Sequence, residues 1–379
     1  MRAVPAGGTE EAAAEAPVGV AAGRLHAAAP EVDPEERALL AFAVAFKGLL
    51  RGRMRDAVCV RAEACVARGD LPEEALTEEP IYRWWSAALR AQQDFYVDVT
   101  AAIVDRQLEA LAATARTIAR DPGPGSLTLD PSVRVPTYQA AVDIHCVPGS
   151  YFLERIADDV GPGARSELGS LAFAMGRHGA MNEDKGVVAA EFARSFAPDL
   201  AIRRILDLGC TIGMSTLAWC DAFPAAEVHA VDVSAPCLRY GHARARALGR
   251  CVHFRQADAE ALPYPDGSFD VVASHILLHE TSRAALPRIF AECHRVLVPG
   301  GAMVHVEVPI RDLDPAAAFL ARWDAWNNNE PFWGHLAGLD LAGLCVQAGF
   351  PQEGVVETVV PSAHQKAGGW LVLAARKPA

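Results

Sequence analysis

From residue 202 onward, short apolar runs alternate with longer segments whose apolar residues recur every three or four positions. Short apolar runs are typical of strands buried on both faces, and the periodic segments are typical of helices packed on a sheet. The alternation predicts an α/β fold with an open, doubly wound sheet. The expected strands are residues 205–208, 227–232, 251–256, 269–274, 302–308, 355–360 and 370–375, and the expected helices are residues 215–222, 236–248, 284–297 and 339–348.

The residues before this region have a different pattern. Pro34 followed by two glutamates marks a helix start, and apolar residues then recur at helical spacing as far as residue 50. A second helix is expected over residues 58–68 and a long one over residues 81–120, where a run of Pro and Gly ends it. We expect an all-helical module that serves as a lid over a pocket, as a dimer surface, or only for packing.

The chain therefore divides into four expected regions. The first residues are rich in Ala, Gly, Pro and Glu with few large apolar side chains, which is typical of a flexible tail. Loops punctuated by glycine and carrying polar side chains separate the helical module from the sheet. The expected boundaries are 1–33 for the flexible tail, 34–135 for the helical lid or dimerisation domain, 136–200 for bridging helices and loops, and 201–379 for the sheet domain with an insertion at 309–335.

Composition narrows the class of protein. The 379 residues carry a net charge of -12, so the clustered Lys and Arg of a nucleic-acid surface are not expected. Nine cysteines are scattered without a CxxC pair, which indicates reduced thiols in a cytoplasmic protein and neither a metal site nor a disulfide framework. No signal-peptide pattern is visible, and the most apolar early run, residues 38–46, is too short to span a bilayer. We expect no membrane partner.

The chemistry centres on residues 205–216. An apolar strand runs into a tight bend bracketed by Gly209 and Gly213, and a helix begins near Ser215. Glycine allows a positive φ and lets a ligand lie against bare backbone, so the segment is typical of a nucleotide-type cradle. Asp207 can hold an ammonium group, and the absence of Lys or Arg between Asp207 and Asp232 counts against phosphate ligands such as NAD(P) or ATP.

Two more acids follow the next two strands. Asp232 closes the second expected strand, 25 residues after Asp207, where a carboxylate can accept hydrogen bonds from ribose hydroxyls. Asp258 follows the third expected strand, where a carboxylate can accept from the exocyclic amine of adenine. The three acids and the glycine turn together indicate a cationic adenosyl ligand.

In this order, these residues resemble the class I S-adenosylmethionine-dependent methyltransferases of the small-molecule type. Asp207, Gly209 and Gly213 match the first motif of that family, and residues 296–301 match its turn before the fifth strand, although Thr211 replaces a glycine found in many members. The resemblance implies a Rossmann-like sheet of seven strands, an antiparallel last strand, and S-adenosyl-L-methionine as cofactor. The residues implied at the cofactor are Asp207, Gly209, Cys210, Thr211, Gly213, Asp232, Val233, Asp258, Ala259 and Ser274.

Methyl transfer from a sulfonium is an in-line displacement, so alignment supplies much of the rate. A hydroxyl acceptor needs a base, whereas a carboxylate does not. The family often presents its substrate to the loop beyond the fourth strand, where His279 is our first candidate for the base, followed by His275 and Glu280. For each of the three, a purely structural role in the loop is the alternative.

Acceptor recognition is expected from the bridge and the insertion. Their aromatic rings can pack around an apolar acceptor, and their amides can hydrogen-bond to it. Core packing and loop structure are the alternative roles for the same side chains. The expected substrate-binding residues are Tyr138, His145, Tyr151, His178, Trp326, Asn329 and Trp333.

The function indicated is methyl transfer to a small molecule, at a hydroxyl or carboxylate oxygen, in the biosynthesis of secondary metabolites. A homodimer through the helical module is a further expectation. Two alternatives stay open. One is a non-methylating use of the sulfonium, such as cyclisation of the aminobutyrate arm of the cofactor. The other is a non-catalytic protein that binds the cofactor and serves in assembly.

Overall fold

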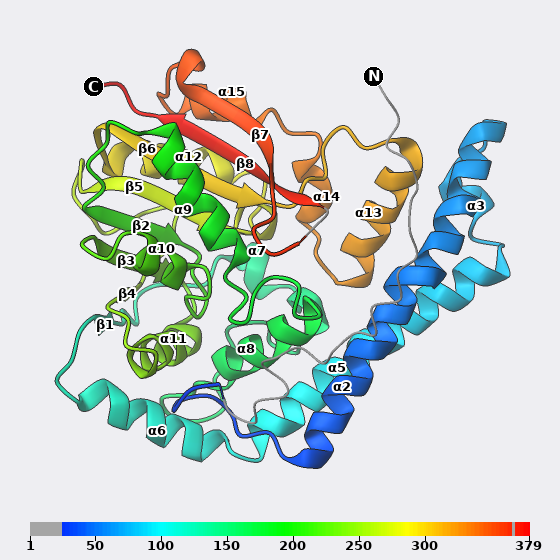
Figure 1. Ribbon diagram of the computed structural model, residues 1–379, viewed down its shortest axis with the longest axis horizontal. Helices are drawn as coiled ribbons and strands as arrows, with labels where there is room; N and C mark the ends of the chain where they lie inside the picture. The colour runs from blue at the N-terminus through cyan, green and yellow to red at the C-terminus, as the bar shows by residue number, and fades with distance from the viewer. Residues whose placement is uncertain (1–24, 366–367) are drawn as a thin grey trace.

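The computed structural model describes residues 25–365 and 368–379. Its core is an eight-stranded sheet with the order β1-β4-β3-β2-β5-β6-β8-β7 (Figure 1). The strands from β1 to β6 pair in parallel, whereas β8 is antiparallel to both of its neighbours, which confirms the antiparallel strand expected at 370–375. The strands are β1 (Ser126–Thr128), β2 (Arg204–Leu208), β3 (Glu227–Asp232), β4 (His253–Gln256), β5 (Phe269–His275), β6 (Leu297–Glu307), β7 (Val355–Pro361) and β8 (Gly369–Arg376).

Helices cover both faces of the sheet, as the doubly wound interpretation predicted. Neighbouring residues of an inner strand point to opposite faces, so both faces must be apolar. On β2, Ile205 packs in the core on one face and Leu206 in the core on the other. The first face is covered by α9 (Asp184–Phe196), α10 (Thr216–Ala222) and α11 (Ala235–Ala247), and the second by α12 (Leu286–Val296) and α15 (Leu341–Gln347).

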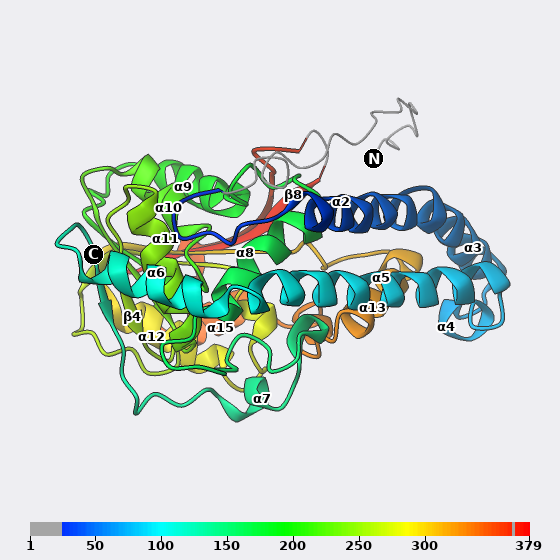
Figure 2. The same cartoon turned by 90° about the horizontal axis from the view of Figure 1, so that it is seen from below.

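The helical module forms a long arm beside the sheet domain (Figure 2). In it α2 (Pro34–Leu49) lies against α5 (Pro80–Asp105). The start of α2 agrees with the sequence, because Asp33 and Glu36 form a reciprocal capping box. A π-helical turn (Leu50–Met54), α3 (Arg55–Arg68) and α4 (Pro72–Ala75) connect the two long helices.

The single long helix expected over residues 81–120 is wrong. It breaks after α5, and α6 (Leu108–Arg120) starts a new direction (Figure 1). Gln107 sits at the break, where its side-chain amide donates to the carbonyls of Ile103 and Glu31. The break lets the arm turn onto the sheet domain, where α6 packs against α11.

The insertion after β6 packs against the arm. It contains α13 (Pro315–Asn327) and α14 (Trp333–Leu336). The ring of Trp323 lies 4.1 Å from the ring of Trp85, centroid to centroid, and its indole N–H donates to Ser86 Oγ at 2.8 Å. The arm therefore holds α13 in place, and with it the residues that follow α13 beside the cavity described below.

Several boundaries differ from the expectation. The sheet has eight strands rather than seven, because β1 extends it beside β4 from inside the region assigned to the helical module. The bridge contains α7 (Thr137–Ala140), a 3₁₀ turn (Ile144–Cys146) and α8 (Gly161–Phe173), and we did not predict α8. Of the expected flexible tail, residues 1–24 lie outside the described residues. In the remainder His26, Ala28 and Ala29 are buried, so the boundary at 33 is too late. None of the helices in the described ranges combines the length and the hydropathy needed to cross a bilayer.

Candidate active site

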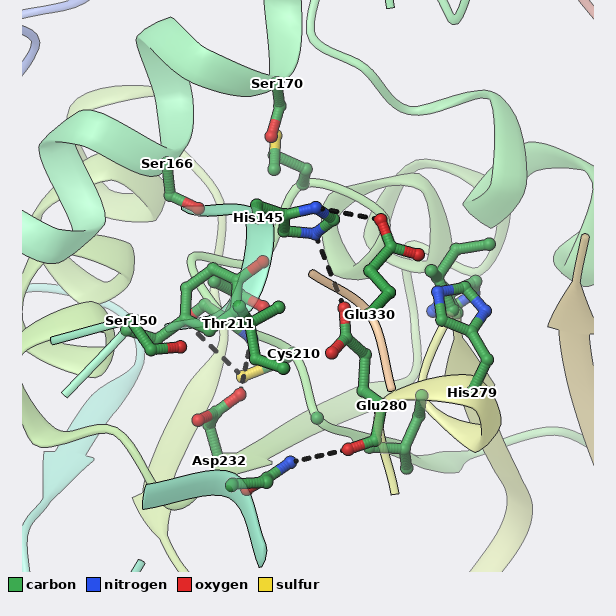
Figure 3. A pocket seen from close by; sticks show the side chains of 18 of the residues that line it. His145, Ser150, Ser166, Ser170, Cys210, Thr211, Asp232, His279, Glu280 and Glu330 are labelled. Carbon is green, nitrogen blue, oxygen red and sulfur yellow. Dashed lines mark hydrogen bonds and ion pairs between the residues drawn. The ribbon is translucent and has the colours of Figure 1, made fainter. Parts of the chain in front are cut away.

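A cavity of about 380 Å³ opens at the carboxyl ends of the central parallel strands. It is lined on one side by the glycine turn and the acids after β2, β3 and β4, and on the other by α8, the 3₁₀ turn of the bridge and the insertion. Figure 3 shows the side chains that meet there. Ligands of open α/β sheets bind at this edge, so the fold places the predicted chemistry where the topology expects it.

The glycine turn after β2 needs its glycines. Gly209 has a φ of 65°, and a Cβ there would lie 2.6 Å from Leu277 Cδ1. Gly213 has a φ of 77°. Thr211, which replaces the family's usual glycine, also takes a positive φ of 51°, so this non-glycine residue holds the backbone in the same left-handed region. The left-handed backbone at these positions forms a tight turn, and its residues 209–211 line the cavity.

Asp207, at the end of β2, is held by two side chains, and each of its oxygens keeps a lone pair for a further donor. Its Oδ2 accepts from Thr216 Oγ1 at 2.5 Å and its Oδ1 from His275 Nδ1 at 3.1 Å. The other ring nitrogen of His275 accepts from the indole N–H of Trp219 at 3.3 Å. Because an indole N–H can only donate, His275 carries its proton on Nδ1 and has no free nitrogen. His275 orients Asp207.

Asp232, at the end of β3, is held by backbone donors. Its two oxygens accept from the N–H groups of Thr211 at 2.9 Å and Ser234 at 2.8 Å. Burial raises the pKa of the Asp232 carboxyl to about 6 in spite of these two donors. Asp258 also faces the cavity, and burial raises its pKa. A ligand that donates hydrogen bonds to these two carboxylates would favour their charged forms.

At the other end of the cavity, His279 forms a pair with Glu307. His279 lies in a 3₁₀ turn (Leu278–Glu280) after β5, and its Nδ1 is 2.6 Å from Glu307 Oε2. Glu307, at the end of β6, also accepts from the backbone N–H of Leu278 at 2.6 Å. Burial opposes a charge on His279, but the attraction of Glu307 outweighs it and raises the pKa of His279 to about 9. Nε2 of His279 is left for the cavity.

A second charged cluster lies beside this pair. His145 stands between Glu280 and Glu330, with its Nε2 3.5 Å from Glu280 Oε1 and its Nδ1 3.0 Å from Glu330 Oε1 (Figure 3). Burial opposes its charge, but the two carboxylates raise the pKa of His145 to about 10. The cluster joins the bridge, the sheet domain and the insertion at one point.

Comparisons with known proteins identify the family. A methyltransferase-domain family model matches residues 205–301. An uncharacterised methyltransferase of Synechocystis sp. is 35% identical over 173 residues, which are 45% of this chain and 73% of that relative. The chain belongs to the class I S-adenosylmethionine-dependent methyltransferases.

Other relatives of this methyltransferase match over shorter stretches. The demethylmenaquinone methyltransferase of Thermus thermophilus is 40% identical over 120 residues, 31% of this chain and 54% of that protein. The malonyl-[acyl-carrier protein] O-methyltransferase of Halorhodospira halophila is 41% identical over 104 residues, 27% of this chain and 34% of that protein. The chain thus spans about half the length of the first relative and about a third of the second. Among solved structures, human N-acetylserotonin methyltransferase is 17% identical with a TM-score of 0.41, over 57% of this chain and 58% of that chain.

The methyltransferase cavity has the groups that S-adenosylmethionine requires. Gly209 lines the cavity without a side chain, and the buried carboxylate of Asp232 lines it beside the turn, where it suits ribose hydroxyls. Asn182 lines the cavity, and its buried Oδ1 can accept a hydrogen bond from the ammonium of the methionine portion. Lys185 also lines the cavity, and burial lowers its pKa to about 8. These residues fit the cofactor.

Most residues predicted from the sequence line the cavity of the methyltransferase, but four do not. Gly213 supports the turn through its positive φ and does not line the cavity. Ser274 is buried, and its hydroxyl lies 2.6 Å from His305 Nδ1. Trp326 lines a separate groove between α5 and α13 and is 67% exposed. The amide of Asn329 donates to the Asp143 carbonyl instead of facing the cavity. The predicted residues that line the cavity are Asp207, Gly209, Cys210, Thr211, Asp232, Val233, Asp258, Ala259, His275, His279, Glu280, Tyr138, His145, Tyr151, His178 and Trp333.

Sequence reasoning missed Glu330 and left Glu307 outside the expected site residues. Glu330 comes from a loop whose pattern gives no sign of a charged partner, because His145 is 185 positions away. Asn182 and Lys185 were also missed. Asn182 lies in the loop before α9 and Lys185 in the first turn of α9, and both line the cavity.

Proposed function

We propose that the protein transfers a methyl group from S-adenosylmethionine to an oxygen atom of a small molecule. The observation that carries the proposal is the His279–Glu307 pair. Glu307 holds Nδ1 of His279, and its other ring nitrogen is left for the cavity that the cofactor residues share. A histidine oriented in this way is suited to take a proton from a hydroxyl or to bind an anionic oxygen.

Each of the cofactor residues would bind a different part of S-adenosylmethionine along the cavity. Asp232 would accept from the ribose hydroxyls and Asp258 from the adenine amine. Asp207 and Asn182 would bind the ammonium, and Lys185 would pair with the carboxylate of the methionine portion. We propose that His275 acts as a positioning residue for Asp207, because both of its nitrogens are used.

When bound, the cofactor supplies a methyl group made electrophilic by the sulfonium, and an in-line displacement leaves S-adenosylhomocysteine. The lone pair of the acceptor oxygen forms the new bond to the methyl carbon while the carbon–sulfur bond breaks toward sulfur. A hydroxyl acceptor releases one proton in this step, and His279 Nε2 is placed to take it. A carboxylate acceptor releases none. The cavity wall, which includes Tyr138, Tyr151 and Trp333, keeps water from the acceptor.

The charge of His279 decides between these two oxygen acceptors. With a pKa of about 9, His279 is an imidazolium at neutral pH and cannot accept a proton until the pH rises. At neutral pH it donates a hydrogen bond from Nε2 and favours an acceptor oxygen that is already anionic. Carboxylates and acidic hydroxyls are therefore the acceptors that the site favours.

We propose that the helical arm supports the acceptor side of the site and offers a dimer surface. The insertion depends on the arm through the packing of α13 on Trp85 and Leu89. Along α2, Leu39, Phe42 and Leu49 are exposed apolar side chains at helical spacing. Such a stripe on a protein of net charge -12 favours association with a second copy over a nucleic acid.

The proposal is tested by incubating the protein with methyl-labelled S-adenosylmethionine and a fractionated metabolite pool. We expect label in a small-molecule fraction together with an equal amount of S-adenosylhomocysteine. The Asp232→Asn variant is the matched control and should transfer little label. Label that appears only in protein or RNA, or methylthioadenosine as the coproduct, would contradict the proposal.

A further inference from the structure

The cluster around His145 has an unbalanced charge. One imidazolium lies between two carboxylates, and each carboxylate uses a single oxygen for it. Oε2 of Glu280 and Oε2 of Glu330 have no hydrogen-bond partner within the described ranges of the chain. Glu330 is 4% exposed, and both glutamates line the cavity. The second oxygen of each carboxylate is turned away from His145 in Figure 3 and keeps lone pairs that a ligand in the cavity can use.

Neighbouring groups do not cancel this charge. His279 is the other cation at this end of the cavity, and it already balances Glu307. Lys47 is buried nearby, but its ammonium nitrogen lies 3.5 Å from the centre of the Phe173 ring and forms no hydrogen bond to any of the residues that the structure describes. Burial and the nearby Arg51 lower the pKa of Lys47, which makes it a weak counter-ion. Counted over these two ion-paired clusters, three carboxylates face two imidazoliums.

We propose that the acceptor carries a positively charged nitrogen, which binds against the carboxylates of Glu280 and Glu330 that line the cavity. This inference rests on the proposed acceptor site. A buried carboxylate is costly unless it is paired, and an ammonium group supplies both the charge and the hydrogen bonds. The acceptor is then an amino-bearing small molecule whose oxygen is presented to His279.

The aromatic rings of the cavity suit the same ligand. Tyr151 and Phe173 have ring centroids 6.3 and 5.8 Å from that of His145, so they already surround a cation. Trp333 packs beside His279 at 5.8 Å and lines the cavity. Aromatic faces attract ammonium groups when the site is shielded from water. Carboxylates with aromatic walls select a cation over a neutral isostere.

One other cation competes for these carboxylates, namely the sulfonium of the cofactor. S-Adenosylhomocysteine lacks that charge and is otherwise the same ligand, so comparing the two cofactor forms separates the alternatives. If the carboxylates serve the sulfonium, removing one of them weakens S-adenosylmethionine binding but not S-adenosylhomocysteine binding. If they serve the acceptor, neither affinity changes.

The test uses calorimetry on the full chain and on the Glu280→Gln and Glu330→Gln variants, with Glu191→Gln on the exposed side of α9 as the matched control. The protein saturated with S-adenosylhomocysteine is titrated with 2-phenylethylamine and with its neutral isostere 2-phenylethanol. We expect the amine to bind at least about tenfold more tightly, and each cavity variant to remove about tenfold of that preference. The control variant should keep it.

Two results would overturn the inference. The first is an equal affinity for the amine and the alcohol in the unmodified protein, and the second is a variant that loses affinity for S-adenosylmethionine alone. Binding of S-adenosylhomocysteine also reports that each variant is folded. If S-adenosylhomocysteine does not bind the unmodified protein, the proposed function fails instead, and the amine preference is then read in the cofactor-free protein.

Discussion

Nδ1 of His279 lies 2.6 Å from Oε2 of Glu307, and this contact ties the loop after β5 to the end of β6. The pair fixes the ring and raises the pKa of His279 to about 9. For a hydroxyl acceptor we predict that kcat/KM rises about tenfold per pH unit up to about pH 9, because only the neutral ring accepts a proton. For a carboxylate acceptor the profile should not rise over this range. Initial rates across pH with each acceptor type measure the difference.

Glu307→Gln tests the same pair from the other side. Without the carboxylate the pKa of His279 should fall toward about 6.5, so the rising limb of a hydroxyl profile should move to lower pH. His279→Gln should lose about 10²- to 10⁴-fold in turnover of a hydroxyl acceptor, with cofactor affinity unchanged. A rising limb that stays in place in Glu307→Gln would show that another group titrates.

Asp232→Asn should weaken S-adenosylhomocysteine binding by about 10- to 100-fold, since a charge-assisted hydrogen bond to ribose is lost. In the unmodified protein the affinity should fall as the pH drops below about 6, because protonation of Asp232 removes the charged acceptor that the ribose hydroxyls prefer. Calorimetry over this pH range checks both statements. Asp98→Asn, at an exposed position on α5, is the control and should show neither effect.

Gly209→Ala should destabilise the protein by about 1–3 kcal/mol and weaken cofactor binding. The φ of 65° is strained for alanine, and the new Cβ would press on Leu277 at 2.6 Å. Gly48 offers the contrast, because it lies exposed in α2 with no atom within 4 Å of an added Cβ. Gly48→Ala should raise the free energy of unfolding by about 0.5–1 kcal/mol and leave cofactor affinity unchanged. Denaturant unfolding of the two variants compares them directly.

Glu167→Gln should cost about 3–5 kcal/mol of stability, because it leaves the buried guanidinium of Arg244 without its carboxylate partner. Glu167 accepts from His26 Nε2 at 2.9 Å, from Arg244 Nε at 2.6 Å and from the hydroxyl of Tyr240. Burial opposes its charge, but Arg244 outweighs this and lowers the pKa of Glu167 to about 2. This stabilisation is therefore fully present above the ordinary pKa of 4.5 and is lost as the pH falls toward about 2. Unfolding curves at pH 7 and pH 3 should show a smaller difference between variant and parent at the lower pH.

The order and type of elements in the sheet domain followed from the sequence. The strand 227–232 was predicted to the residue. The strand at 205–208 was recognised because a buried parallel strand is a nearly continuous apolar run. The glycine turn and the acids at 207, 232 and 258 were found because their roles need fixed residue types at fixed places. These features are local, so a single sequence displays them.

The features that sequence reasoning missed depend on distant contacts. No proline or glycine marks the break between α5 and α6 in the sequence. The break is stabilised instead by the side chain of Gln107, which donates a hydrogen bond to the carbonyl of Glu31. The short β1 exists only because β4 offers an edge to pair with. The partnership of His145 with Glu330 requires the arm to place α13, and no periodicity in the sequence encodes that arrangement.

The most direct test of the central claim is the position of the transferred methyl group. The protein is incubated with S-adenosylmethionine labelled with ¹³C in the methyl group and with a fractionated pool of small metabolites, and the labelled product is analysed by NMR. The account predicts a single labelled methyl bonded to oxygen in an amino-bearing small molecule. A label bonded to carbon or to nitrogen would contradict the assignment of His279 and Glu307 as the groups that face the reacting atom.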